Sequence, residues 1–203
     1  MTNYEYIIAS LPFLTPDYTY TGDGSFAGIT DEIRSLLDKR DSAILDTLLG
    51  GFDEKNLDKS FYEAALKNRC GFIRDYFHFD MQLRNAKVRF LNRELGRPEG
   101  TDVMILGEED TEEEFEEAAQ IEFVLGQEDI LTREKGLDDI MWMKLDEMSL
   151  FHWFDLTAIL SYVAKLHIVD RWLRLDDATG REMFKKLVNE VRGTFKGVEY
   201  KEK

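Results

Sequence analysis

The sequence predicts a mostly α-helical protein, built as an elongated multi-helix bundle. Apolar residues recur every three or four positions over most of its 203 residues, which is the helical period. It also contains only three prolines, so nothing interrupts a helix on proline grounds over 17–97 or from 99 onward. We expect a single helical domain over 1–203, or two lobes, about 1–97 and 111–203, joined by a linker.

The N-terminal segment has the weakest helical pattern. Residues 4–14 form a short aromatic and aliphatic run interrupted by Pro12, which predicts a short strand or a half-buried extended arm. Residues 15–28 contain Pro16 and three glycines, which predicts a loop.

The first strong helical stripe follows this loop. Thr30 is predicted to cap its N-terminus, because a threonine hydroxyl accepts a hydrogen bond from a free N–H group of the first turn. The stripe contains Ile33, Leu36, Leu37, Ile44, Leu45 and Leu48. Gly50 and Gly51 are predicted to end this single helix.

The most regular segment is 58–95. Its apolar residues, at spacings of 4, 3, 4, 3 and 4, are Phe72, Tyr76, Phe79, Leu83, Ala86 and Phe90. This spacing predicts the seam of a long helix packed against near-parallel neighbours. Gly71 is predicted to bend or split the helix, and Gly96 with Pro98 to end it.

The second half of the chain predicts further helices after a linker at 97–110. An acidic helix is expected from Thr111, and an amphipathic helix over 128–148. Residues 150–175 are apolar over most of a helical circumference, which is typical of a central helix. Asp177 is predicted to cap a last helix.

An aromatic cluster accompanies the central helix. Its members are Phe151, Trp153, Phe154, Tyr162 and Trp172. Most of it is expected in the core, where Trp153 widens the apolar face, although the cluster could also line a pocket or a peptide groove. Trp153 and Phe154 cannot face the same side of a helix, so one of them is expected at a surface.

The formal net charge of −15 restricts the choice of partner. Such a surface repels nucleic-acid phosphates and anionic membranes, and it favours basic proteins, although it also simply keeps a protein in solution. No apolar run approaches the roughly 20 residues that span a bilayer, and the N-terminus does not resemble a signal peptide. We therefore expect a cytoplasmic location, with no nucleic acid bound and no direct transmembrane segment.

Motifs that carry chemistry are not visible. The chain has no phosphate-binding glycine loop, no HExxH and only one cysteine, Cys70. His167 and Asp170 come nearest to a ligand pair, but a histidine at the edge of the core explains them more simply. Asp138–Asp139 resembles the start of the DDxxD motif of helical prenyl-transferring enzymes, but its third carboxylate is missing. We expect no catalytic residue, no cofactor and no metal.

Two surfaces are candidates for binding a partner protein. One is the acidic helix, with Glu112, Glu113, Glu116 and Glu117. The other is the polar side of the long helix, around Arg84, Asn85 and Arg89. A solvated helix face is the simpler explanation of the acidic cluster.

Three stretches carry a resemblance to a known family. They are YEYIIASLPFL at the start, FDMQLRNAKVRFLNRELGRP in the middle and ILSYVAKLHIVDRWLRLDDATGREMFKKLV near the end. Together they resemble an uncharacterised bacterial family (DUF2764-like) whose genes lie among those of V-type (A-type) ATPase subunits. The middle stretch also resembles the C/d-type central-stalk subunit, through Asp80, Asn85 and Arg89 or Arg93.

The resemblance implies a non-catalytic subunit or accessory factor of a V-type ATPase. Its partners would then be other ATPase subunits, and the protein would lie peripherally on the inner membrane through the complex. The alternatives are a helical chaperone that binds a client peptide and a helical enzyme.

Overall fold

The computed structural model describes residues 2–20, 24–106 and 115–175, and it is mostly helical, as predicted. Its α-helices are α1 (Tyr4–Ser10), α2 (Phe26–Leu36), α3 (Lys39–Gly50), α4 (Lys59–Leu66), α5 (Gly71–Glu94), α6 (Ala118–Leu125), α7 (Ile130–Ser149) and α8 (Leu156–Leu173). A 3₁₀ turn spans Glu54–Asn56. Two short antiparallel strands, β1 (Leu14–Thr15) and β2 (Thr19–Tyr20), pair Leu14 with Tyr20.

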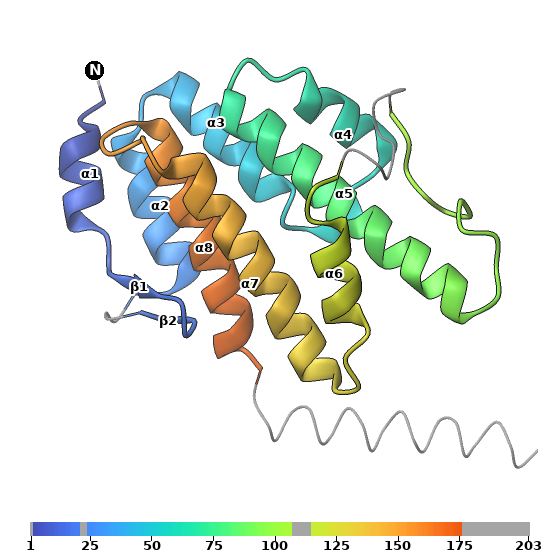
Figure 1. The fold of residues 1–203 in the computed structure, drawn as a ribbon. Coiled ribbons are helices and arrows are strands. Elements are labelled where there is room, and N and C mark those ends of the chain that lie inside the picture. Colours follow the sequence, from blue (N-terminus) through green and yellow to red (C-terminus); the bar gives the residue numbers. More distant parts are fainter. Residues whose placement is uncertain (1, 21–23, 107–114, 176–203) are drawn as a thin grey trace, which may run out of the picture.

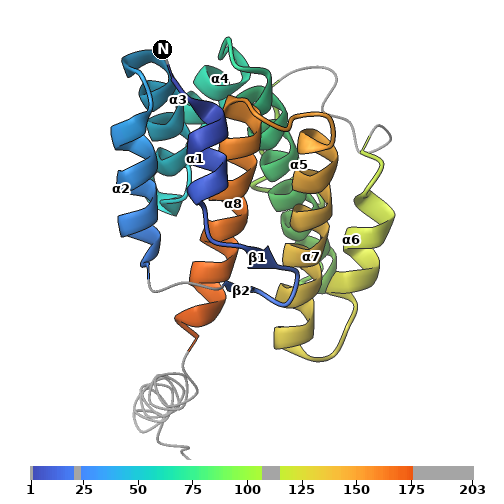
Figure 2. The same cartoon turned by 90° about the vertical axis from the view of Figure 1, so that its left-hand side faces the viewer.

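Helix α8 occupies the central position that its apolar circumference predicts. It packs against α7 on one side and against α1, α2 and α3 on the other (Figures 1 and 2). Helix α5 contacts α4, α6 and α7, so α5, α7 and α8 form the middle of the bundle. Within the described ranges, no helix is both long enough and apolar enough to cross a membrane.

The N-terminal run is a helix rather than a strand or an extended arm. The Asn3 side chain accepts a hydrogen bond from the Tyr6 amide and caps α1. Ile7 is buried, and the Tyr4 hydroxyl donates to Asp41 at 2.5 Å. Contacts with α8 and α3 therefore stabilise a helix that is too short to persist alone, and the strand is confined to residues 14–15.

The predicted helix from Thr30 to Gly50 is in fact two helices. Ser25 caps α2, and Thr30 lies inside it, donating its hydroxyl proton to the carbonyls of the preceding turn. Asp38 accepts from the amides of Arg40 and Asp41, so it caps α3 and starts a new helix. The prediction was wrong because the apolar stripe continues on both sides of the break. The predicted end at Gly50 is confirmed.

The predicted long helix is split, and Gly71 is the first residue of its longer part. Asn68 accepts from the amide of Cys70 between α4 and α5. The predicted seam is buried from Phe72 to Leu83, whereas Phe90 is only half-buried. The helix ends before Gly96, which adopts φ +64°, a conformation that favours glycine.

Two asparagines on α5 hold the predicted linker against the helix. Asn85 donates to the Met104 carbonyl at 2.7 Å and accepts from the Met104 amide at 2.9 Å. Asn92, two turns later, donates to the carbonyls of Glu99 and Thr101. Asn85 is 3% exposed, so the prediction that it lies on a partner-binding surface was wrong. Its amide is used inside the protein because two main-chain groups would otherwise lack a partner.

The described part of the predicted acidic helix is helical only from Ala118 to Leu125, as α6, and not in its acidic first turns. Residues 107–114, including Glu112 and Glu113, lie outside the described ranges, and α6 begins only at Ala118. Glu117 pairs with Lys144 at 3.0 Å. The predicted last helix after Asp177 also lies outside the described residues.

Candidate functional site

The connection between α7 and α8 exposes a run of large apolar side chains. The exposed fractions are 60% for Leu150, 84% for Phe151, 71% for Trp153 and 59% for Phe154. The predicted helix over 150–175 therefore starts too early. Trp153 does not widen its apolar face, and both Trp153 and Phe154 lie at the surface.

The reason for this exposure is the position of the helix cap. The Asp155 carboxylate accepts from the Ala158 amide at 3.1 Å, so α8 begins at Leu156. The same carboxylate lies 2.5 Å from Nδ1 of His152. The loop is thus held at its base, while its aromatic side chains point away from the core.

A groove of about 520 Å³ lies beside this loop. His152 lines it from the loop, and Pro12 and Phe13 line it from the segment after α1. Phe13 is 70% exposed, and the Tyr162 hydroxyl donates to the Pro12 carbonyl at 2.9 Å. The loop lies at the same end of the bundle as the start of α1 (Figures 1 and 2). The aromatic surface consists of the four exposed loop residues Leu150, Phe151, Trp153 and Phe154.

The described residues that were predicted to bind a partner lie outside this loop. Arg84 pairs with Asp80 at 2.9 Å and with Glu54 at 3.7 Å. Arg89 is half-buried on α5, Glu116 is exposed, and Glu117 is paired with Lys144 as described above. Neither Arg84 nor Glu117 is therefore a free charge at the surface.

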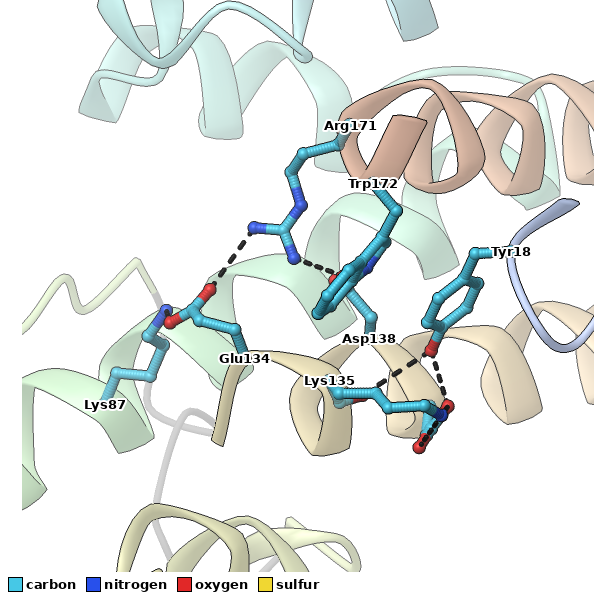
Figure 3. A network of polar contacts seen from close by, with 8 residues as sticks. Tyr18, Lys87, Glu134, Lys135, Asp138, Arg171 and Trp172 are labelled. Atoms are coloured by element: carbon cyan, nitrogen blue, oxygen red, sulfur yellow. Dashed lines mark hydrogen bonds and ion pairs between the residues drawn. The ribbon is translucent and has the colours of Figure 1, made fainter. Parts of the chain in front are cut away.

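A second candidate site is a cavity of about 360 Å³ between α5, α7 and α8. Ion pairs connect the three helices along it (Figure 3). Lys87 of α5 lies 3.7 Å from Glu134 of α7, which lies 3.2 Å from Arg171 of α8. Arg171 also pairs with Asp138, which accepts from the Trp172 indole at 2.6 Å.

At the other end of the cavity, Asp80 accepts hydrogen bonds from two side chains. Its Oδ2 accepts from the Tyr62 hydroxyl at 2.6 Å and from Arg84 at 2.9 Å. Burial and the adjacent carboxylate raise the pKa of the Tyr62 phenol. Tyr62 therefore keeps its proton and acts as a hydrogen-bond donor.

The neighbouring aspartates of α7 belong to different contacts. Asp138 faces Arg171 and Trp172 (Figure 3). Asp139, in contrast, accepts from the Tyr18 hydroxyl at 2.5 Å and pairs with Lys135 at 3.0 Å. Burial raises the pKa of the Asp138 carboxyl, and the nearby guanidinium opposes this shift. Consecutive helical residues diverge by about 100°, so the two carboxylates do not converge on one ligand.

Tyr18 is a contact that the sequence pattern did not reveal. It adopts φ +58° in the β1–β2 turn, and its ring stacks on Trp172 with centroids 5.4 Å apart. A tyrosine in a stretch that is predicted to be a loop carries no signal for a contact with a helix more than 100 residues later.

His167 and Asp170 are not paired with each other. His167 stacks on Phe52, whereas Asp170 pairs with Arg174 at 2.8 Å. Burial lowers the pKa of His167 to about 4, so its imidazole is neutral at pH 7. Within the part of the chain that the structure describes, no three His, Cys, Asp or Glu side chains are grouped as metal ligands.

Comparison with known proteins places the chain in a family. No curated protein matches it, and no solved structure does. A family model described as "Protein of unknown function (DUF2764)" matches residues 52–194, which is well over half of the chain. The matched region contains α4 to α8, and with them the cavity and the aromatic loop. The chain therefore belongs to the DUF2764 family.

Proposed function

We propose that this protein is a non-catalytic subunit or accessory factor of a V-type ATPase and that it docks onto the complex through the aromatic surface. The observation that carries the docking proposal is the exposure of Phe151, Trp153 and Phe154 within one short loop. Clustered exposed apolar side chains mark protein-interaction sites, and tryptophan and other aromatics dominate the binding energy of interfaces.

The ATPase assignment rests on the resemblance of the three stretches described above. The resemblance to the C/d-type subunit supports a position near the central stalk, peripheral on the cytoplasmic side of the inner membrane. The net charge of −15 supports a partner surface that combines basic residues with an apolar pocket.

The charges inside the protein are consistent with a structural role. Arg171 and Lys87 are each engaged by carboxylates from another helix, and Arg84 by Asp80 of its own helix and by Glu54. Such ion pairs fix the relative positions of α5, α7 and α8. A rigid bundle presents the aromatic loop in one geometry, which lowers the entropic cost of docking.

Co-purification from native membranes tests the proposal. The tagged protein, bound in low-salt detergent, should recover ATPase subunits. Recovery should fall at least about tenfold in the Phe151→Ala/Trp153→Ala variant, because losing interface aromatics typically costs 2 kcal/mol or more. Phe123→Ala is the matched control, since Phe123 on α6 is 73% exposed but lies outside the aromatic surface.

The groove beside the loop favours a second candidate function, a chaperone that binds an apolar client peptide. Its 520 Å³ and its apolar lining from Leu11, Pro12 and Phe13 suit a short extended segment. The same purification separates the two functions. Recovery of an enzyme precursor, without ATPase subunits, would replace the ATPase proposal with the chaperone.

A further inference from the structure

The cavity between α5, α7 and α8 contains polar groups that form no hydrogen bond with any described residue. Tyr76 is only 7% exposed and lines the cavity, yet its hydroxyl bonds to no residue within 2–20, 24–106 or 115–175. His167 lines the same cavity, and its imidazole nitrogens likewise form no hydrogen bond with a described residue. No fully enclosed polar side-chain atom of the described part lacks a partner, so both groups are open to the cavity. They are available to a ligand.

The charges that line the cavity do not balance. The carboxylates are Glu54, Asp80, Glu134 and Asp138, and the permanent cations are Arg84, Lys87 and Arg171. His167 adds no positive charge, because burial keeps it neutral. The carboxylates that line the cavity therefore outnumber the cations by one.

The remaining lining is apolar and aromatic. The ring of Phe52 stacks on His167 with centroids 4.0 Å apart, and its edge meets Tyr76 at 6.5 Å. The apolar aliphatic side chains that complete the lining are Leu83, Leu137, Met141 and Ile168. A volume of about 360 Å³ lies in the range of small-molecule sites, which join apolar walls to a few convergent polar groups.

We propose that this cavity binds a small organic cation, in which a primary amine or guanidine is attached to an apolar or aromatic body. One positive charge neutralises the lining, whereas an anion would add to its excess negative charge. The ammonium lies beside Glu54 at the mouth, and it donates to the Tyr76 hydroxyl. The body packs along the Phe52–His167 stack. This inference does not depend on the proposed ATPase role.

Three probes with the same aromatic body test the charge preference. They are 2-phenylethylamine, the neutral 2-phenylethanol and the anionic phenylacetate, each titrated into the full-length protein at pH 7 and followed by calorimetry and methyl NMR of Met141. We expect saturable binding of the amine, at least about tenfold tighter than the alcohol, since a charge-assisted hydrogen bond is about twice as strong as a neutral one. The carboxylate is expected to bind more weakly than the alcohol.

Two conservative substitutions locate the binding. Glu54→Gln removes the excess carboxylate at a side chain that is 85% exposed, and it should weaken amine binding about tenfold. Glu63→Gln is its control, since exposed Glu63 is outside the cavity. Tyr76→Phe keeps the ring but removes the hydroxyl, and it should weaken amine binding about threefold to tenfold. Tyr6→Phe, at a surface tyrosine, should change nothing.

Several results would overturn the proposal. They are equal affinity for the amine and the alcohol, tighter binding of the carboxylate, and no saturable amine binding at millimolar concentrations. Amine binding that is unchanged in both Glu54→Gln and Tyr76→Phe would place the site elsewhere. Circular dichroism of each variant establishes that a loss of binding is not a loss of folding.

Discussion

The imidazole of His167 lies flat on the ring of Phe52, with centroids 4.0 Å apart and planes inclined by 3°. The stack joins α8 to the segment that follows α3, and Tyr76 of α5 meets it edge-on. A histidine held in this way is part of the packing of the bundle, and protonating it places a charge among aromatic rings.

The protein should therefore become less stable as the pH falls, because protonation of His167 favours the unfolded state. Its pKa is about 4 in the folded state and ordinarily about 6.5, so the unfolded chain binds the extra proton between these values and stability is lost as pH falls from 6.5 to 4. Between pH 7.5 and 5 the loss is about 2 kcal/mol. Urea melts of wild type and His167→Phe should show that the variant loses less stability over this range. Equal losses would mean that His167 does not titrate as the structure implies.

Substitutions on the buried face of α5 should cost more stability than a substitution on its exposed face. Phe79→Ala and Leu83→Ala remove buried side chains and should each cost about 2–5 kcal/mol of unfolding free energy. Leu91 is 53% exposed, and Leu91→Ala should cost less than about 1 kcal/mol. Denaturant melts measure all three. A cost below about half a kilocalorie for both buried positions would contradict the packing of the seam.

Asn85 should behave as a structural residue. Asn85→Ala removes both hydrogen bonds to Met104 and leaves its main-chain groups unsatisfied, which should cost about 2–4 kcal/mol. Hydrogen exchange should show faster exchange of the Met104 amide in the variant. If the variant instead kept its unfolding free energy but no longer bound a partner protein, Asn85 would be a partner-binding residue.

The ion pair between Asp138 of α7 and Arg171 of α8 should make a pH-dependent contribution to the stability of the protein. In Arg171→Gln the Asp138 carboxylate loses its guanidinium, and the variant should be less stable by about 1–3 kcal/mol at pH 7, a range reduced because Arg171 is 42% exposed. The pKa of Asp138 is already raised by burial and should rise further. A carboxyl whose pKa is raised in the folded state makes the protein less stable as pH rises. The stability difference between the variant and wild type should therefore shrink near pH 4. If the stability difference between the variant and wild type did not change with pH, the loss of packing alone would explain it.

Trp153 should be the most accessible tryptophan of the described residues. It is 71% exposed, whereas Trp142 is 8% exposed. Acrylamide should quench the fluorescence of wild type strongly, Trp153→Phe should lose most of this accessible component, and Trp142→Phe should retain it. Protection of Trp153 from acrylamide on addition of a partner would identify the docking face directly.

Much of the helical pattern could be predicted, because it depends on local spacing. The buried run from Phe72 to Leu83 and the end of α3 at Gly50 follow from apolar period and glycine position alone. The break at Asp38 could not be predicted in this way, because its apolar stripe continues across it. The short helix at Tyr4–Ser10 was also missed, since contacts with α3 and α8 stabilise it.

The sequence by itself determined that this protein is helical, acidic and built around the apolar segment that forms α8, because composition and periodicity are properties of neighbouring residues. Tertiary structure alone decided which polar groups meet. Arg171 reaches Asp138 and Tyr18 reaches Asp139 across 33 and 121 residues, and Asn85 turns inward to a loop rather than outward to a partner. It also decided that Trp153 lies outside the core, because the cap at Asp155 starts α8 after the aromatic loop. Side-chain pairing between distant segments depends on how whole helices pack, and local spacing does not encode it.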